Sequence, residues 1–433
     1  MINRYRKATA FWRKYGTRAL MARIRGEFAR KVEQTSVPFI LPGPVAKSVA
    51  QLSQARFAAL APLSTYLLPG PPRRRVNMVT DSIGRESLFG GVGTALIFCT
   101  LLANRLGADL RIITRTERSP PDNVEHILSV YGLALQGEIQ FKFLPPDAVK
   151  ESVDFSATEL FITTSWWTTA ATLPSVPTRS IVYLLQEDER MFYPFGDDRL
   201  RCEQVLRRSD IRFVINTRLL FEHFVAEGFS NIQQAGSWFE PSFPARVFYP
   251  RPQQAGNKRK FIFYARPHNQ RNLFFLGIEV IEAAIAQQVL DLAQWEIILA
   301  GKDIPPDLVF EGGHVPARHE NMNWSDYANL VGTIDLGLSL MYTPHPSYPP
   351  LDLVASGAVV VTNRFANKQD LGPYSANLIC VEPEKAALVE AIRQGVVLAT
   401  NPAVRAQNFQ ANRLGTDWNQ SFADILGRIG GSN

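Results

Sequence analysis

The sequence predicts an α/β protein in which two parallel, doubly wound sheets follow one another along the chain. Short runs rich in β-branched and aromatic residues alternate with segments of helical hydrophobic spacing, which is typical of parallel sheets with crossover helices. A stretch rich in Pro, Gly and charge at 240–260 divides this alternation into two series. The chain has 433 residues, 46% of them hydrophobic and 20% charged, a composition that suits globular domains with sizeable cores.

Residues 1–75 are predicted to form a basic helical extension and a connector. Residues 1–31 contain ten Lys or Arg against one acid, Glu27, so this segment carries +9 and the rest of the chain −3, within a total of +6. Apolar side chains at helical spacing between the charges suit an anionic membrane surface. The alternative is a solvated helix that docks on the protein body. Because the basic charge is confined to this segment and no nucleic-acid motif accompanies it, we expect no nucleic-acid partner.

Residues 76–250 are predicted to form the first Rossmann-like domain. Its β-rich runs lie at 76–80, 110–114, 160–169, 179–186 and 211–217, and its clearest helical spacing lies at 90–107 and 218–229. Residues 251–400 are predicted to form the second such domain, and residues 401–433 a terminal helix. The second domain has β-rich runs at 260–266, 295–301, 334–340, 358–363 and 378–383, and helical spacing at 272–290, 323–333 and 385–400. We expect the two sheets to face a cleft, which is the usual place for a ligand.

The three cysteines, Cys99, Cys202 and Cys380, have neither a disulfide pattern nor metal-ligand spacing. They are expected to be thiols in a reducing compartment. The sequence has no apolar run of membrane-spanning length and no signal-peptide pattern. We therefore expect a cytoplasmic protein.

A glycine-rich turn follows the first predicted strand. Gly90, Gly91 and Gly93 allow a ligand to approach the backbone closely and leave N–H groups free at the helix start. Their spacing differs from the dinucleotide fingerprint, so NAD is not expected. The alternative is that these glycines serve only tight packing of the strand against the helix.

An acidic and aromatic segment, residues 183–198, ends another strand of the first domain. Asp188 and Glu189 lie there among aromatic side chains, a mixture that suits contacts to sugar hydroxyls and stacking on sugar rings. Trp166 and Trp167 have the same character, although both are also compatible with a core position. A metal-binding pair of acids is conceivable in this segment, but we expect no metal.

Three cations lie at strand ends of the second domain. Arg266 and Arg271 follow its first strand, and Lys302 follows its second. The arginine fork suits bidentate phosphate binding without a metal. The alternative is a set of surface ion pairs, which contribute little to stability.

The segment Pro344–Asn363 places several polar side chains between two predicted strands. His345, Ser347 and Tyr348 lie in a proline-rich loop, and Asp352 lies in the first turn of the short helix that follows. The N–H groups at such a helix start suit a diphosphate. Asp352 can accept hydrogen bonds from the two hydroxyls of a ribose, or it can serve only the helix dipole.

These motifs together resemble the GT-B glycosyltransferases, and in particular the WsaF-type rhamnosyltransferases of bacterial polysaccharide assembly. The resemblance spans roughly 76–400 and is carried by "FGGVGTAL", "LLQEDERMFYP", "FYARPHNQRN" and "PHPSYPPLDLVASG". It implies an acceptor-binding first domain and a second domain that binds the nucleotide-sugar, with no obligatory metal. Asp352 stands where related transferases have a glutamate, and Pro344 stands where they have a second carboxylate. The resemblance leaves retention or inversion of the anomeric centre open.

By position, the resemblance implies roles for individual residues. The donor would be held by Arg266, Arg271, Lys302, Ser347, Tyr348 and Asp352, and the acceptor by Gly90, Gly91, Gly93 and Glu189. His345 and Asp188 are the candidate catalytic groups. The expected reaction transfers rhamnose from dTDP-rhamnose to a growing surface polysaccharide on a lipid-linked acceptor, at the inner face of the cytoplasmic membrane. The alternatives are a nucleotide-sugar epimerase of the same fold and a non-catalytic sugar-binding component of an assembly complex.

Overall fold

The computed structural model describes residues 47–69, 74–84, 90–118, 120–148, 151–252 and 258–430. The predicted basic segment 1–31 lies outside these residues. The chain divides into two compact units, residues 1–56 and 57–433. The described part of the first unit contains the helix α2 (Val49–Arg56).

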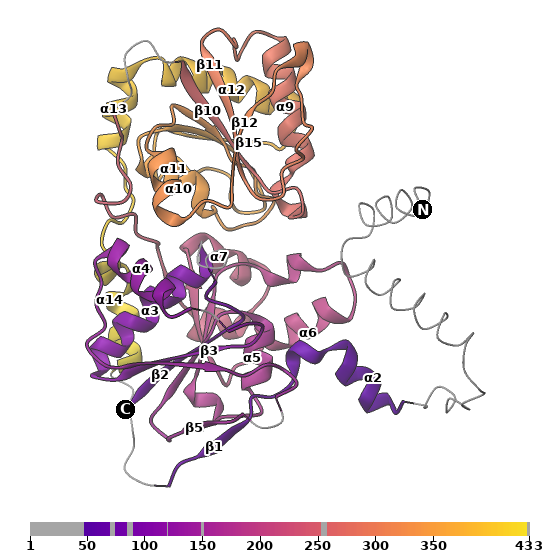
Figure 1. Cartoon of the computed structure of the whole chain (residues 1–433), viewed down its shortest axis with the longest axis vertical. Coiled ribbons are helices and arrows are strands. Elements are labelled where there is room, and N and C mark those ends of the chain that lie inside the picture. Colours follow the sequence, from indigo (N-terminus) through magenta and orange to yellow (C-terminus); the bar gives the residue numbers. More distant parts are fainter. Residues whose placement is uncertain are drawn as a thin grey trace, which may run out of the picture. The chain divides into compact units, whose positions relative to one another are not determined.

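The first domain contains a sheet of seven parallel strands in the order β4-β3-β2-β6-β7-β8-β9 (Figure 1). The strands are β2 (Arg75–Thr80), β3 (Asp109–Thr114), β4 (Ile139–Phe143), β6 (Leu160–Thr163), β7 (Ile181–Leu185), β8 (Arg212–Asn216) and β9 (Ser237–Phe239). The helices are α3 (Gly91–Leu106), α4 (Asp122–Tyr131), α5 (Trp166–Thr172), α6 (Asp197–Leu206), α7 (Arg218–Ala226) and α8 (Ser230–Ala235). Successive strands run outward from β2 to β4 and then from β6 to β9. The order therefore reverses between β2 and β6.

The second domain contains six parallel strands in the order β12-β11-β10-β13-β14-β15. They are β10 (Arg259–Ala265), β11 (Trp295–Gly301), β12 (Ala317–Glu320), β13 (Leu336–Leu338), β14 (Val359–Asn363) and β15 (Leu378–Val381). The helices are α9 (Phe274–Ala286), α10 (Trp324–Val331), α11 (Tyr348–Ala355), α12 (Lys385–Ala399) and α13 (Pro402–Gln410). The strand order reverses between β10 and β13. The predicted α/β class with two doubly wound parallel sheets is confirmed.

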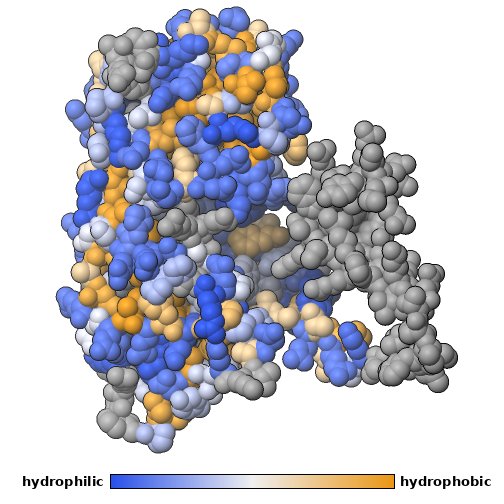
Figure 2. Space-filling model, viewed as in Figure 1, coloured by the Kyte–Doolittle hydropathy of each residue, from blue (hydrophilic) through white to orange (hydrophobic). Residues whose placement is uncertain are grey.

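The central strands form because their apolar runs are buried on both faces by helices. All five residues of β7 and all five of β14 are buried. Continuous apolar runs of this kind are typical of parallel strands covered on both sides. The visible face of the molecule is mainly hydrophilic with scattered apolar side chains (Figure 2).

The last helix, α14 (Trp418–Gly430), packs against the first domain rather than the second. Its Phe422 ring lies 4.5 Å from Phe239 of β9 and 5.0 Å from Phe98 of α3, measured between ring centroids. Figure 1 shows α14 beside α3. The C-terminal segment therefore connects the two sheets a second time.

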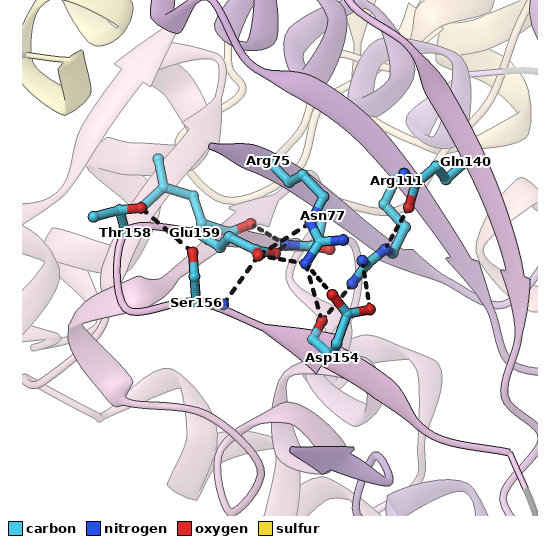
Figure 3. Close-up of polar contacts among 9 residues, drawn as sticks. Arg75, Asn77, Arg111, Gln140, Asp154, Ser156, Thr158 and Glu159 are labelled. Carbon is cyan, nitrogen blue, oxygen red and sulfur yellow. Dashed lines mark hydrogen bonds and ion pairs between the residues drawn. The ribbon is translucent and has the colours of Figure 1, made fainter. Parts of the chain in front are cut away.

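A buried ionic network ties the start of β2 to its neighbours (Figure 3). Arg75 donates to Asp154 of β5 (Val153–Phe155) and to Glu159, each at 2.6 Å. Arg111 of β3 donates to the other oxygen of Asp154 at 3.0 Å, and Asn77 donates to Glu159 at 2.9 Å. Strand β5 pairs with β1 (Thr65–Leu67) in a separate two-stranded sheet. The network therefore holds this small sheet to the amino-terminal edge of the large one.

One local prediction is wrong. Residues 160–169 do not continue as one β-rich run, because β6 ends at Thr163 and α5 begins at Trp166. Ser165 accepts from the Thr168 N–H, and the Thr168 hydroxyl accepts from the Ser165 N–H, which forms a capping box. This reciprocal cap outweighs the β propensity of the tryptophans and threonines.

Two of the predicted thiols, Cys99 and Cys202, are buried, and Cys380 is half-buried; all three are unpaired. Within the described residues, the helices are all too short or too polar to cross a membrane.

Candidate functional site

The carboxyl ends of the strands in the second sheet bring several cations together. Arg271 lies in the 3-10 turn after β10, and Lys368 lies in the loop after β14. Lys368 is fully buried and donates from Nζ to the Met341 carbonyl at 2.9 Å. Burial lowers the pKa of this ammonium to about 8. A buried lysine without a carboxylate in hydrogen-bond contact is costly, which is typical of a site that binds an anion.

Arg271 makes an ion pair across the two sheets. Its Nη1 donates to Glu187 Oε2 at 2.9 Å, and Glu187 follows β7 of the first domain. The guanidinium also lies 4.4 Å from the ring centroid of Phe192, a cation–π contact. Burial raises the pKa of Glu187, and the charge of Arg271 opposes that rise. In this structure the predicted phosphate-binding arginine is thus neutralised by a carboxylate of the other domain.

His345 is a buried, neutral imidazole. It is 4% exposed, and burial lowers its pKa to about 3, with the charges of Lys368 and Arg271 acting in the same direction. Nδ1 accepts from the Ser347 N–H at 2.9 Å, so the proton of the neutral ring is on Nε2. Nε2 is buried without a hydrogen-bond partner among the described residues. The ring therefore presents an unused donor rather than a base.

The start of α11 offers few free N–H groups. Pro349 and Pro350 have none, so Tyr348 and Leu351 supply the only amide hydrogens of its first turn. Ser347 precedes the helix with φ of +71°, a left-handed conformation that directs the chain into it. Anion binding at this helix therefore depends on the surrounding side chains more than the sequence pattern indicated.

Tyr348 joins the second domain to the glycine-rich turn of the first. Its hydroxyl lies 2.6 Å from Thr94 Oγ1 of α3 and accepts from Asn216 Nδ2 at 2.9 Å. Gly90, at φ of +71°, is close enough that an added Cβ would lie 3.7 Å from the Tyr348 ring. The turn that was predicted to bind the acceptor is therefore in contact with the start of the helix that was predicted to bind the donor.

Asp352 lines a small cavity between the domains. The cavity is bordered by the glycine-rich turn and by Tyr131, Phe243, Trp324, Tyr348 and Trp418. Asp352 Oδ2 accepts from the Tyr327 hydroxyl at 3.0 Å, whereas Oδ1 is buried without a hydrogen-bond partner among the described residues. Burial raises the pKa of Asp352 to about 8, although the hydrogen bond from Tyr327 lowers it. One oxygen of the carboxyl group is thus engaged and the other is available.

The two remaining predicted donor-site cations lie at the rim. Arg266 is exposed at the end of β10, and its backbone N–H donates to Asn272 Oδ1 at 2.7 Å. Lys302 is half-buried after β11, and its N–H donates to the Ala265 carbonyl at 3.3 Å. Both therefore lie at the same edge of the sheet as Arg271.

Asp188 and Glu189 are buried and already engaged. Burial would raise the pKa of Asp188, but hydrogen bonds from His223 and Arg190 outweigh it and lower the pKa to about 2. Glu189 Oε2 accepts from the Trp166 N–H at 2.7 Å, at the start of α5, and burial raises its pKa to about 8. The catalytic role for Asp188 and the acceptor role for Glu189 stay predictions.

Sequence reasoning missed Lys368, Tyr327 and Asn216. Lys368 lies five residues after β14, so a systematic inspection of strand ends would have found it. Asn216 ends β8, so the same inspection would have found it. Tyr327 carries no such signal, because its role depends on a contact with α11, which lies elsewhere in the sequence.

Comparison with known protein families shows to which family the chain belongs. Residues 75–218 match the family described as "WsaF, N-terminal domain", and residues 259–393 match "WsaF, C-terminal domain". Together the two matches cover more than half of the chain. The chain belongs to the WsaF family. Its fold is that of the GT-B glycosyltransferases.

A curated relative is the O-antigen biosynthesis protein RfbC of Myxococcus xanthus, which is 30% identical over 340 residues. The match covers 76% of this WsaF-family chain but 24% of RfbC, so the chain spans about a quarter of the relative's length.

Solved structures share the fold at low sequence identity. HepE of Anabaena, solved in complex with UDP-glucose, matches with a TM-score of 0.55 and 15% identity over 82% of this chain and 98% of HepE. WaaG, a glycosyltransferase involved in lipopolysaccharide biosynthesis, matches with a TM-score of 0.53 and 11% identity, over 83% of this chain and all of WaaG.

Proposed function

We propose that this WsaF-family chain transfers rhamnose from dTDP-rhamnose to a growing bacterial surface polysaccharide. The observation that carries the proposal is the pair of cations Arg271 and Lys368 beside the start of α11, at the carboxyl edge of the second sheet. Ligands of open α/β sheets bind at this edge, where the strand order reverses. The name of RfbC supports a place in O-antigen assembly.

The leaving group of this reaction is a nucleoside diphosphate, and its charge rises as the bond to the anomeric carbon breaks. Arg271 and Lys368 would stabilise that charge, with Arg266 and Lys302 at the rim. The neutral His345 would donate from Nε2 to an oxygen of the donor. These groups supply the positive charge that a metal ion supplies elsewhere, so the proposed reaction requires no metal.

The hydrogen bonding of Asp352 supports a donor whose nucleotide contains deoxyribose rather than ribose. A carboxylate that faces a ribose can accept from both its 2′- and 3′-hydroxyls, one at each oxygen. Here Tyr327 donates to Oδ2, whereas Oδ1 is the oxygen without a hydrogen-bond partner among the described residues. A single free oxygen matches the single hydroxyl of the deoxyribose in dTDP.

The proposal is tested by thermal-shift measurements with dTDP, UDP, GDP, ADP and CMP, with and without magnesium. A nucleotide at 100 times its Kd should stabilise the protein by about 2.7 kcal/mol. We expect dTDP to give the largest shift without magnesium. Arg271→Ala and Asp352→Ala should abolish the shift, whereas Arg393→Ala, on the exposed face of α12, should retain it.

A shift from none of the nucleotides would contradict the transferase proposal and favour a non-catalytic sugar-binding protein. Dependence of the dTDP shift on magnesium would contradict the metal-free binding. When dTDP-rhamnose is incubated with the enzyme, conversion into another dTDP-sugar without transfer would favour an epimerase.

A further inference from the structure

The first sheet has its own reversal of strand order, between β2 and β6, and two polar side chains meet there. Asp81 directly follows β2, and Trp167 lies in the second position of α5, just after β6. Trp167 Nε1 donates to both carboxylate oxygens of Asp81, at 3.0 and 2.8 Å. A reversal point between strand ends is where doubly wound sheets form a ligand crevice.

The position of Trp167 is set by a buried acid. Glu189 Oε2 accepts from the Trp166 N–H, and Trp166 Nε1 donates to the Tyr193 hydroxyl at 3.0 Å. The Ser165 capping box adds two further bonds at the same helix start. Glu189 is 4% exposed, and its bond to the Trp166 N–H holds the start of α5 in place.

Asp81 keeps acceptor capacity beyond its bond to Trp167. An ionised carboxylate offers about four lone-pair positions, and one indole N–H uses two of them. Burial raises the pKa of Asp81, whereas Trp167 and the charge of Arg115 lower it. Its backbone carbonyl is fixed by the N–H groups of Arg115 and Thr116, at 3.1 and 3.0 Å. The carboxylate is therefore held in place at the end of the strand.

An aromatic side chain connects Trp167 with the cation site of the second domain. Phe192 is 38% exposed; its ring centroid lies 6.5 Å from that of Trp167 and 4.4 Å from the Arg271 guanidinium. Two neighbouring aromatic rings, one of them bonded to a carboxylate, are a combination that suits the apolar face and the hydroxyls of one sugar ring.

We propose that Asp81, Trp167 and Phe192 form the subsite for the acceptor sugar, with Asp81 accepting a hydrogen bond from an acceptor hydroxyl. The inference rests on the proposed transferase function. It assigns the acceptor-sugar subsite, which that proposal did not locate. Phe192 places this subsite next to Arg271, so that an acceptor sugar and a donor diphosphate bind on neighbouring sides of one ring.

The test uses saturation-transfer NMR on the full chain with methyl α-L-rhamnoside, methyl α-D-mannoside and methyl β-D-galactoside as probes. We expect saturable binding of at least one glycoside, weakened at least about tenfold by Asp81→Asn, since a hydrogen bond to a charged group is lost. Trp167→Phe should weaken it too. Asp147→Asn, at an exposed turn of the same domain, should bind like the wild type.

Binding of dTDP in each variant, measured by thermal shift, serves as the folding control and separates the two proposals. If dTDP binds neither to the wild type nor to any variant, the transferase proposal fails. If dTDP binds normally but the wild type binds none of the glycosides, or both variants bind them as the wild type does, the subsite proposal is overturned. If Asp81→Asn does not fold, Trp167→Phe decides the outcome.

Discussion

At the scale of single residues, one hydroxyl group bonds the carboxyl group that we propose to contact the nucleotide. Tyr327 engages Asp352 Oδ2, and the proposal that this selects deoxyribose gives a direct prediction. Tyr327→Phe should free the second oxygen for a ribose 2′-hydroxyl. We expect the ratio of the Kd for UDP to that for dTDP to fall several-fold, the value of one hydrogen bond.

Calorimetric titration of both nucleotides would measure this ratio. Tyr66→Phe is the matched control, because Tyr66 is 51% exposed on the small two-stranded sheet. An unchanged ratio in Tyr327→Phe would mean that Asp352 does not select the sugar of the nucleotide.

Glu189 predicts a pH dependence of stability. Its pKa is about 8 in the folded protein against an ordinary value of 4.5, because of burial. Between these two values the native state keeps a proton that the unfolded chain releases. The contribution to stability is therefore complete below pH 4.5 and is lost as the pH rises towards 8, at no more than about 1.4 kcal/mol per pH unit.

Glu189→Gln removes this titration while retaining an oxygen that can accept from the Trp166 N–H. Urea unfolding at several pH values should show a wild-type free energy that falls more steeply with pH than that of the variant. Glu138→Gln, on the exposed end of the loop before β4, should behave like the wild type. Parallel pH profiles for the wild type and Glu189→Gln would show that Glu189 is ionised in the native state.

At the scale of secondary-structure elements, α14 packs on the first domain largely through one aromatic side chain. Phe422 is fully buried between α3 and β9. Phe422→Ala should lower the free energy of unfolding by about 3–5 kcal/mol, through lost burial and a residual cavity. Phe195→Ala, at a ring that is 91% exposed, should change it little. Denaturant unfolding followed by circular dichroism measures both; equal stabilities would mean that α14 does not contribute to the core.

At the scale of the whole molecule, the Arg271–Glu187 pair links the two domains, and it would compete with the proposed donor diphosphate for the same guanidinium. Glu187→Gln should release Arg271 and tighten dTDP binding several-fold. Arg271→Ala should weaken binding in either background. Weaker binding by Glu187→Gln would instead assign Glu187 a direct role in holding the nucleotide.

The basic segment 1–31 gives a second prediction for the whole molecule. Deletion of these residues should reduce association with anionic liposomes, since each Lys or Arg near such a surface contributes about 1 kcal/mol. Nucleotide binding should be unchanged. Sedimentation with liposomes of anionic and of neutral lipids measures the effect; undiminished association of the truncated chain would place membrane contact elsewhere.

The sequence by itself determined the class of fold and the edge of the second sheet where the candidate site lies. Strand β7 is apolar throughout and β14 begins with three valines because both faces are buried, and this leaves a local pattern that can be recognised. Strand ends can also be recognised from the sequence pattern. This allowed the prediction of site roles for Arg266, Arg271, Lys302 and Asp352. The position of α5 was missed because the Ser165 cap opposes the β propensity of the residues around it.

Only the tertiary structure decided which groups act together. Arg271 and Glu187 are 84 residues apart, and Thr94 and Tyr348 are 254 apart, so no local pattern relates them. Burial depends on the whole fold; it keeps His345 neutral and places Lys368 in the interior. The fold also brings the Tyr327 hydroxyl to one oxygen of Asp352. Ionisation and pairing depend on neighbours brought together by folding, whereas strand and helix patterns depend on neighbours in the chain.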